Sequence, residues 1–257
     1  MSSELRPSGA SRWLACPASL LLEAQAPVFK SNDKIAAYLG TATHELLECC
    51  VNAKTKPDKY RGAAIEVYDE ETMEFSYTIE VDQRMIDSVQ LFLDYVDESR
   101  LDEAHFVASE LRMDHTEIEG LGGTADYVRI YANGVADLYD LKNGTSPVQA
   151  VSRAGIINKQ LLSYAALLVN KFPQITKVRA AIVSPNVKTK KKVREVEISL
   201  VDITLHEIDC IEVVQTVEEI TPSTIIENSD MGSHCFFCRA RSFCPLQAEA
   251  EILRDFG

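Results

Sequence analysis

Residues 122–144, GGTADYVRIYANGVADLYDLKNG, have the pattern of two strands joined by a short turn. A two-residue Asn-Gly turn would place Asp126 opposite Leu141. A three-residue turn that ends at Gly134, with this glycine in the left-handed conformation, places Asp126 opposite Asp140 instead. The second register also pairs compatible side chains across the strands: Arg129 with Asp137, Tyr127 with Tyr139, and Val128 with Leu138. We therefore expect two carboxylates side by side on one face of a hairpin.

The chemistry of this face follows from its charges. Asp126 and Asp140 would share it with apolar side chains, where two carboxylates repel each other unless a divalent cation neutralises them. Hard oxygen ligands suit Mg²⁺ or Mn²⁺. Lys142 projects to the same face as Asp140, where it can act on a water molecule or stabilise charge on a phosphate. The structural alternative is an ordinary surface strand end, because Asp-x-Lys alone is a common pattern.

The surrounding pattern predicts one α/β domain in which helices cover a mixed sheet. Helices are expected at 11–24, 37–54, 82–100 and 156–171, and from residue 202 onward. Strands are expected at 74–81, 105–113, 124–131, 135–142, 178–185 and 192–200. Thr41 or Thr43 is expected to cap the second helix, and residues 55–73 to form a loop.

The overall charge argues against broad affinity for nucleic acid, because the net charge is −13 and phosphate contacts need Lys and Arg. The segment KTKKKVR is a local exception, and its basic residues are candidates for contacting DNA: Lys188, Lys190, Lys191, Lys192 and Arg194. A solvated hairpin tip is the alternative interpretation of this segment. With no apolar run of membrane-spanning length and no secretory signal, we expect an intracellular protein without a membrane partner.

Two helices supply further polar candidates for a site. GTATHELLE places His44 early in a helix, with Glu48 one turn later, although a lone helical histidine is usually structural or exposed. NKQLLSYAALL places Gln160 and Tyr164 one turn apart at the edge of an apolar helix, where both can also be ordinary edge residues.

Taken in chain order, GTATH, GGTAD, DLK and QLLSY resemble the motifs of the RecB-like PD-(D/E)xK nuclease superfamily. The resemblance implies a restriction-endonuclease-like core over 36–220. It implies metal binding by Asp126, Asp140, His44 and the Leu141 carbonyl. Catalysis would be carried out by Lys142 together with the two aspartates. Gln160 and Tyr164 would contact DNA or support the site. Glu110 is a further acidic candidate, with a solvent-facing strand residue as the alternative. The chain departs from the usual pattern by having Asp at position 140 and KNG after it.

Four of the seven cysteines complete this resemblance. Cys235, Cys238 and Cys244 form C-x2-C-x5-C, and Cys16 lies far upstream; Cys16 and Cys244 each precede a proline, as cluster ligands often do. A zinc site more usually has two close cysteine pairs. The arrangement is similar to the iron-sulfur nucleases of the Cas4 and AddB type, which implies a 4Fe-4S cluster joining residues 1–30 to residues 230–257. Cys49, Cys50 and Cys210 are interpreted as buried small side chains.

The resemblance implies a metal-dependent DNA nuclease, an exonuclease acting on DNA ends or single strands. SGASRWLACPAS is also similar to a phage and prophage branch of the superfamily, which implies a role in phage-type recombination in the bacterial cytoplasm. A single-strand annealing or recombinase protein would be its partner. Two alternatives stay open: a catalytically silent DNA-end-binding or recombination-accessory protein on the same fold, and a zinc-stabilised interaction module.

Overall fold

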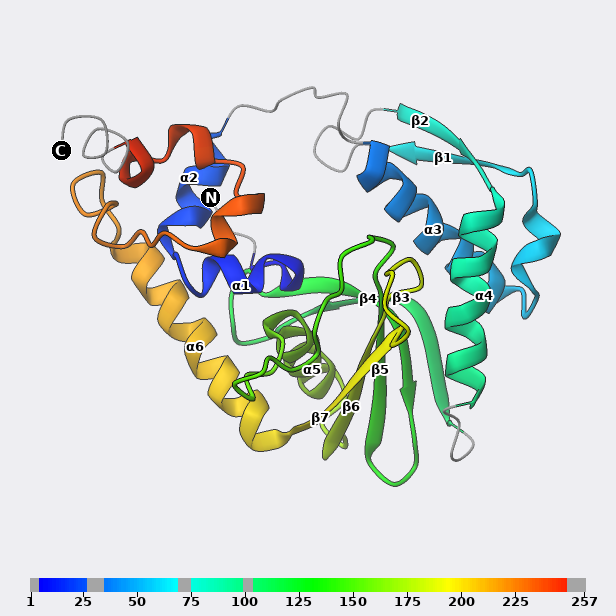
Figure 1. Ribbon diagram of the computed structural model, residues 1–257. Helices are drawn as coiled ribbons and strands as arrows, with labels where there is room; N and C mark the ends of the chain where they lie inside the picture. Colours follow the sequence, from blue (N-terminus) through cyan, green and yellow to red (C-terminus); the bar gives the residue numbers. More distant parts are fainter. Residues whose placement is uncertain (1–4, 27–34, 69–74, 99–103, 249–257) are drawn as a thin grey trace.

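The computed structural model describes residues 5–26, 35–68, 75–98 and 104–248 (Figure 1). The N-terminal half contains η1 (Pro7–Gly9), α1 (Ala10–Trp13), α2 (Ala18–Gln25), α3 (Ile35–Asn52), η3 (Pro57–Tyr60), β1 (Ala64–Tyr68), β2 (Phe75–Glu80), α4 (Gln83–Glu98) and β3 (Phe106–Asp114). It is followed by β4 (Gly122–Ile130), β5 (Val135–Leu141), α5 (Lys159–Lys171), β6 (Lys177–Val183), β7 (Val193–Ser199), α6 (Leu200–Glu219), η4 (Ser233–Phe237) and η5 (Arg241–Phe243).

A five-stranded mixed sheet forms the centre, with the strand order β3-β4-β5-β6-β7. Neighbouring strands are antiparallel except β5 and β6, which are parallel because α5 carries the chain back between them. Strands β1 and β2 form a separate antiparallel pair. The prediction of an α/β fold with a mixed sheet is therefore confirmed.

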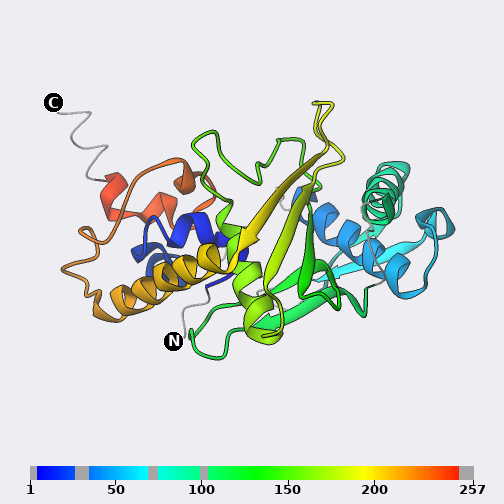
Figure 2. The ribbon, with the colours of Figure 1, turned by 90° about the horizontal axis from the view of Figure 1, so that it is seen from below.

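Helices cover both faces of this sheet (Figures 1 and 2). Side chains of α5 and α6 pack with Val128 and Leu138 in one buried cluster. Side chains of α3 and α4 pack with Tyr127 and Tyr139 in a second cluster on the opposite face. Successive residues of a strand point to opposite faces, so the same hairpin contributes to both cores.

The hairpin β4–β5 adopts the predicted three-residue register, with Tyr127 opposite Tyr139 and Val128 opposite Leu138. Gly134 has φ +79°, and a Cβ on it would lie 3.0 Å from the carbonyl oxygen of Gln174. Glycine is thus required at the turn both for its backbone conformation and for the close approach. The prediction of a left-handed Gly134 is confirmed.

The register is confirmed, but the predicted charge interaction between Arg129 and Asp137 does not form. Arg129 and Asp137 are opposite each other, but Arg129 donates to the Val96 carbonyl at 2.6 Å rather than to Asp137. Asp137 instead accepts from Arg179 at 2.6 Å. The predicted pair is split because the neighbouring elements α4 and β6 supply alternative partners.

Three local predictions need correction. The segment 55–73 is not simply a loop, because η3 and β1 form within it; residues 69–73 lie outside the described ranges. The helix expected at 11–24 is divided into α1 and α2, with Cys16 and Pro17 at the break. Thr41 and Thr43 do not cap α3, because the helix already includes Ile35 and their hydroxyl groups donate to carbonyls one turn earlier.

Candidate functional site

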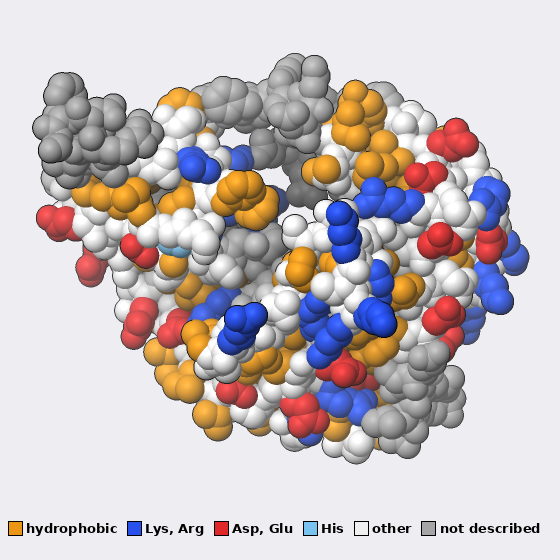
Figure 3. Space-filling model, viewed as in Figure 1, with side chains coloured by type: hydrophobic (Ala, Val, Ile, Leu, Met, Phe, Trp, Pro, Cys, Tyr) orange, Lys and Arg blue, Asp and Glu red, His pale blue; other side chains and the backbone are white. Residues whose placement is uncertain are grey.

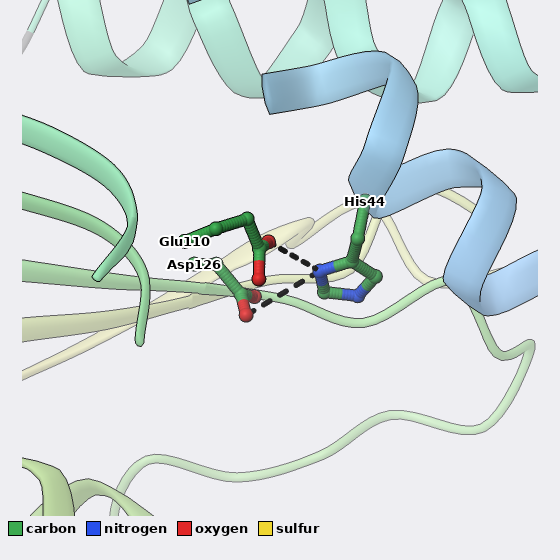
Figure 4. A group of neighbouring side chains, drawn as sticks. All are labelled: His44, Glu110 and Asp126. Carbon is green, nitrogen blue, oxygen red and sulfur yellow. Dashed lines mark ion pairs between the residues drawn. The ribbon is translucent and has the colours of Figure 1, made fainter. Parts of the chain in front are cut away.

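Three acidic or imidazole side chains from three elements converge beside the middle of β3 and β4 (Figure 4). His44 comes from α3, Glu110 from β3 and Asp126 from β4. His44 Nδ1 lies 3.3 Å from Asp126 Oδ1 and 3.6 Å from Glu110 Oε1. Their nearest potential ligand atoms all lie within 4.8 Å of one another, a spacing that suits one cation shared by all three.

Asp140 and Lys142 lie beside this group at the end of β5. The backbone N–H of Leu141 donates to Asp126 Oδ2 at 2.6 Å, which ties the two strands together where their ladder ends. Lys142 Nζ lies 3.1 Å from Asp140 Oδ1 and 3.0 Å from Oδ2. The structure thus brings together the predicted Asp126, Asp140 and Lys142. The Leu141 carbonyl as a metal ligand stays a prediction.

Helix α5 supports Asp140 from the other side. Asn158 caps the helix by accepting the Gln160 backbone N–H at 2.9 Å, and the Gln160 side chain donates to Asp140 Oδ1 at 2.9 Å. Tyr164, one turn later, is 7% exposed and lies close to Gly123, where a Cβ would approach its ring to 3.2 Å. Gly123, the second glycine of GGTAD, therefore lets Tyr164 pack against β4 near the site.

The charges of the site balance one another closely. Burial opposes ionisation of Asp126, but His44 outweighs it and lowers the pKa of this carboxyl below its usual value. Burial also opposes the charge on His44, yet Asp126 and Glu110 together raise its pKa to about 10. Burial raises the pKa of Asp140 to about 6 in spite of Lys142. A protonated His44 therefore neutralises the carboxylates at the position where a cation would do so.

Glu110 has a backbone conformation that strand residues rarely adopt, with φ +47°. The ladder between β3 and β4 continues in the same register on both sides of it, but Glu110 itself has no partner in that ladder. Its Oε1 atom is buried without a hydrogen bond. A left-handed non-glycine residue costs on the order of 1–3 kcal/mol and is typical of functional sites. The Glu110 side chain is half-buried and contacts His44, so Glu110 stays a candidate for the site.

A cleft of about 940 Å³ gives access to these side chains. His44, Glu110, Lys142 and Tyr164 line it on one side. Residues of η1 and the small side chains Ala37 and Gly40 of α3 line it elsewhere, together with Arg112 at the end of β3. His44 and Lys142 therefore both border the same open cleft.

Asparagines 143 and 186 are site neighbours that the sequence reasoning missed. Asn143 donates to the Leu39 carbonyl of α3 at 3.3 Å, and Asn186 donates to Asn143 Oδ1 at 2.7 Å. Asn186 also lies 3.2 Å from Ser88 of α4. These bonds fix the residue that follows Lys142. Only the departure KNG pointed to this position, and nothing marked Asn186.

The basic segment 188–194 forms the connection between β6 and β7, and basic side chains gather on this face in Figure 3. Lys188, Lys190 and Lys191 are exposed. Lys192 donates to the Val187 carbonyl, and Arg194 is 6% exposed and donates to Thr189 at 3.3 Å. Lys192 and Arg194 therefore hold the β6–β7 hairpin together, whereas Lys188, Lys190 and Lys191 are available to a ligand.

The cysteine-bearing segments from the two ends of the chain pack side by side (Figures 1 and 2). Ala18 N–H donates to the Asn228 carbonyl at 3.2 Å, and Arg239 N–H donates to Glu23 Oε1 at 2.8 Å. Burial raises the pKa of the Cys16 thiol, and the nearby Cys244 and Cys235 raise it further. All seven cysteines are free.

Cys16 of the N-terminal segment lies near enough to Cys235 and Cys244 of the C-terminal segment for both to act on its thiol. Within the described part of the chain, no three of the cysteine sulfurs lie within 4.8 Å of one another, as a tetrahedral zinc site with Zn–S bonds of about 2.3 Å requires. Cys238 and Cys244 instead border a hollow of about 500 Å³. Binding of a 4Fe-4S cluster by Cys16, Cys235, Cys238 and Cys244 stays a prediction.

The fold and the site together define a class: an α/β protein with a carboxylate and histidine group at a cleft beside a mixed sheet. The chain belongs to the family described as Protein of unknown function (DUF2800), whose model matches residues 2–254. No helix within the described ranges is both long enough and apolar enough to cross a lipid bilayer.

Two solved structures show a limited similarity to the chain. A candidate exonuclease from Eubacterium rectale is 11% identical, with a TM-score of 0.46, over 94% of this chain and 88% of that chain. An alkaline exonuclease from Laribacter hongkongensis is 12% identical, with a TM-score of 0.35, over 82% of this chain and 91% of that chain.

Proposed function

We propose that the protein is a metal-dependent DNA nuclease that acts as an exonuclease on DNA ends or single strands. One observation carries this proposal: His44, Glu110 and Asp126 converge in a cleft, directly beside the Asp140–Lys142 pair. A structural ion pair would not need the buried carboxylate of Asp126 and the half-buried carboxylate of Glu110 next to it. The order of the sequence motifs supports the same conclusion.

The donor set suits Mg²⁺ or Mn²⁺. Glu110 Oε1 and Asp140 Oδ2 are buried without a hydrogen bond. Each has only an ionic contact, Oε1 with His44 and Oδ2 with Lys142. Carboxylate oxygens with unused acceptor capacity are the ligands that hard divalent cations prefer. We propose that Asp126, Asp140, Glu110 and His44 hold the cation. When bound, such a cation polarises the phosphate and lowers the pKa of a bound water.

Lys142 stabilises negative charge on the phosphate rather than removing a proton. Burial opposes the charge on its ammonium group, but Asp140 and Asp126 outweigh burial and raise its pKa. Lys142 is therefore a cation at neutral pH, held by Asp140 at the edge of the cleft. Gln160 positions Asp140, and Tyr164 supports the wall against which the substrate would lie. Lys188, Lys190 and Lys191 are proposed to bind the DNA backbone.

We further propose that Cys16, Cys235, Cys238 and Cys244 bind a 4Fe-4S cluster that joins residues 1–30 to residues 230–257, outside a nuclease core at 36–220. The packing of the two segments and the hollow beside Cys238 and Cys244 support this assignment. A Cas4-type or AddB-type enzyme of phage recombination, working in the bacterial cytoplasm with an annealing or recombinase protein, is the biological setting that the sequence resemblance supports.

The direct test is digestion of end-labelled linear DNA by purified protein with Mn²⁺ or Mg²⁺. We expect loss of label that a chelator prevents and that the Asp126→Asn/Asp140→Asn double variant lacks. The matched control is Asp82→Asn, which removes a carboxylate near the start of α4, away from the cleft. Equal digestion by the double variant and the wild type would refute the assignment of the site.

A further inference from the structure

The segment that carries three of the cysteines exposes aromatic side chains to an unusual degree. Phe236 is 69% exposed, Phe237 is 79% exposed and Phe243 is 50% exposed. The rings of Phe236 and Phe237 meet edge to face, with their centroids 4.8 Å apart. Contiguous apolar surface that is left in water marks a place where something binds. We refer to Phe236, Phe237, Phe243, Arg239 and Arg241 as the aromatic surface.

The charge of this segment differs from that of the rest of the chain. Residues 231–248 contain Arg239 and Arg241 and no aspartate or glutamate, although the net charge of the whole chain is −13. Both arginines are exposed. Figure 3 shows hydrophobic side chains in the region of this C-terminal segment, at the upper left, with basic side chains next to them. The surface therefore combines aromatic rings with positive charge.

Another exposed apolar patch provides a useful contrast. Val201 is 68% exposed and Leu205 is 58% exposed on α6, a helix with six acidic residues and no lysine or arginine. Such a patch repels phosphate. Rings combined with arginines, in contrast, are typical of surfaces that bind single strands, since bases stack on the rings and arginines neutralise the backbone. A purely apolar protein partner would need no arginines.

The aromatic surface is linked to the cleft through the N-terminal segment. Helix α1 contacts η4, which carries Phe236 and Phe237. The turn η1, which directly precedes α1, lines the same cleft as Lys142 and Tyr164, and Pro7 of η1 lies next to Gly123 as Tyr164 does. The N-terminal segment therefore contacts the aromatic surface with α1 and borders the cleft with η1.

We propose that the aromatic surface is an auxiliary binding site for single-stranded nucleic acid, which holds the unpaired strand while its end lies in the cleft. The choice of ligand rests on the proposed function, but the binding itself does not depend on cleavage. Duplex DNA is not the ligand of this surface, because its bases are already stacked on one another and its exposed face is the backbone.

The test is fluorescence anisotropy with a labelled oligothymidine of about 15 nucleotides, within the site sizes known for single-strand binding, and with a duplex of the same length. Divalent cations are left out, so no cleavage occurs. Replacing both rings in the variant Phe236→Leu/Phe237→Leu keeps an apolar surface but removes stacking, and should weaken oligothymidine binding about tenfold or more. Phe236→Trp/Phe237→Trp should bind at least as tightly as the wild type. Duplex affinity should change in neither.

The matched control is Val201→Ala/Leu205→Ala, which removes exposed apolar side chains from the acidic patch and should leave oligothymidine binding unchanged. Arg241→Gln should reduce the salt dependence of binding by about 0.7 in the slope of log K against log salt. Circular dichroism and iron content verify that each variant is folded. Undiminished binding by the leucine variant, equal losses for oligothymidine and duplex, or no binding by the wild type would each overturn the proposal.

Failure here is distinguishable from failure of the nuclease assignment. Cleavage of DNA by the wild type, with full oligothymidine binding by the leucine variant, would overturn the auxiliary site and leave the nuclease intact. Ring-dependent binding by a protein that cleaves no DNA would uphold the auxiliary site and refute the nuclease.

Discussion

Mild acid is expected to destabilise the fold through one buried histidine. His206 of α6 is 1% exposed, and its Nε2 lies 2.8 Å from the Ser163 hydroxyl of α5. Its Nδ1 atom is buried without a partner, and its ring lies 6.5 Å from that of Trp13. Burial lowers the pKa of His206 to about 4, and nearby Lys159 contributes to the shift.

The sign and size of the effect follow from the pKa of His206 in the two states. The ordinary value is 6.5, so between pH 6.5 and about 4 the unfolded chain binds a proton that the folded chain excludes. The contribution is fully present above pH 6.5 and is lost as the pH falls. Between about pH 7 and about pH 5 the loss is about 2 kcal/mol in the free energy of unfolding, from about 1.36 kcal/mol per pKa unit.

Urea unfolding of the wild type and His206→Gln at these two pH values measures the effect. The variant is less stable at pH 7 because it loses the contact with Trp13, but its stability should fall by about 2 kcal/mol less on acidification. His105→Gln, at an exposed position, should fall as much as the wild type. An identical pH dependence in His206→Gln and the wild type would show that the buried histidine is not the cause.

The other predictions concern the turn, the cleft and the cysteines. Gly134→Val should lower stability by at least about 1–2 kcal/mol, seen in thermal unfolding, because a side chain there forces a left-handed backbone against Gln174. Lys142→Ala should keep Mn²⁺ binding but lose about 10²- to 10³-fold in cleavage rate, measured by single turnover; an unchanged rate would remove it from the site. Cys16→Ala should lose iron and absorbance near 400 nm, while Cys49→Ala should retain both; iron-free wild type after anaerobic purification would contradict the cluster.

The sheet was predictable where strand pattern and turn chemistry agreed. The left-handed Gly134 fixed one register, and the alternation of the strands then fixed which side chains face each core. The actual partners of Arg129 and Asp137 were not predictable, since they come from α4 and β6, which are distant in sequence. Strand β1 was missed because its partner β2 and the helix α3 stabilise a segment that has little pattern of its own.

Part of the site was also predictable from strand pattern and turn chemistry. Asp126, Asp140 and Lys142 follow from one hairpin, and their neighbourhood is local in sequence. The orientation of Glu110 depends on a left-handed residue within a strand, a conformation that no sequence rule assigns to glutamate. The bond between Asn186 and Asn143 joins two loops that only the tertiary fold brings together.

The central claim is that His44, Glu110 and Asp126 form a site for a divalent cation. Titration of the wild type with Mn²⁺, followed by the electron paramagnetic resonance signal of the free ion, tests it most directly. We expect saturable loss of the free-ion signal with the wild type and with the matched control Asp82→Asn, and strongly weakened binding by Asp126→Asn and Glu110→Gln. Equal binding by Asp126→Asn and the wild type, or no binding by the wild type, would contradict it.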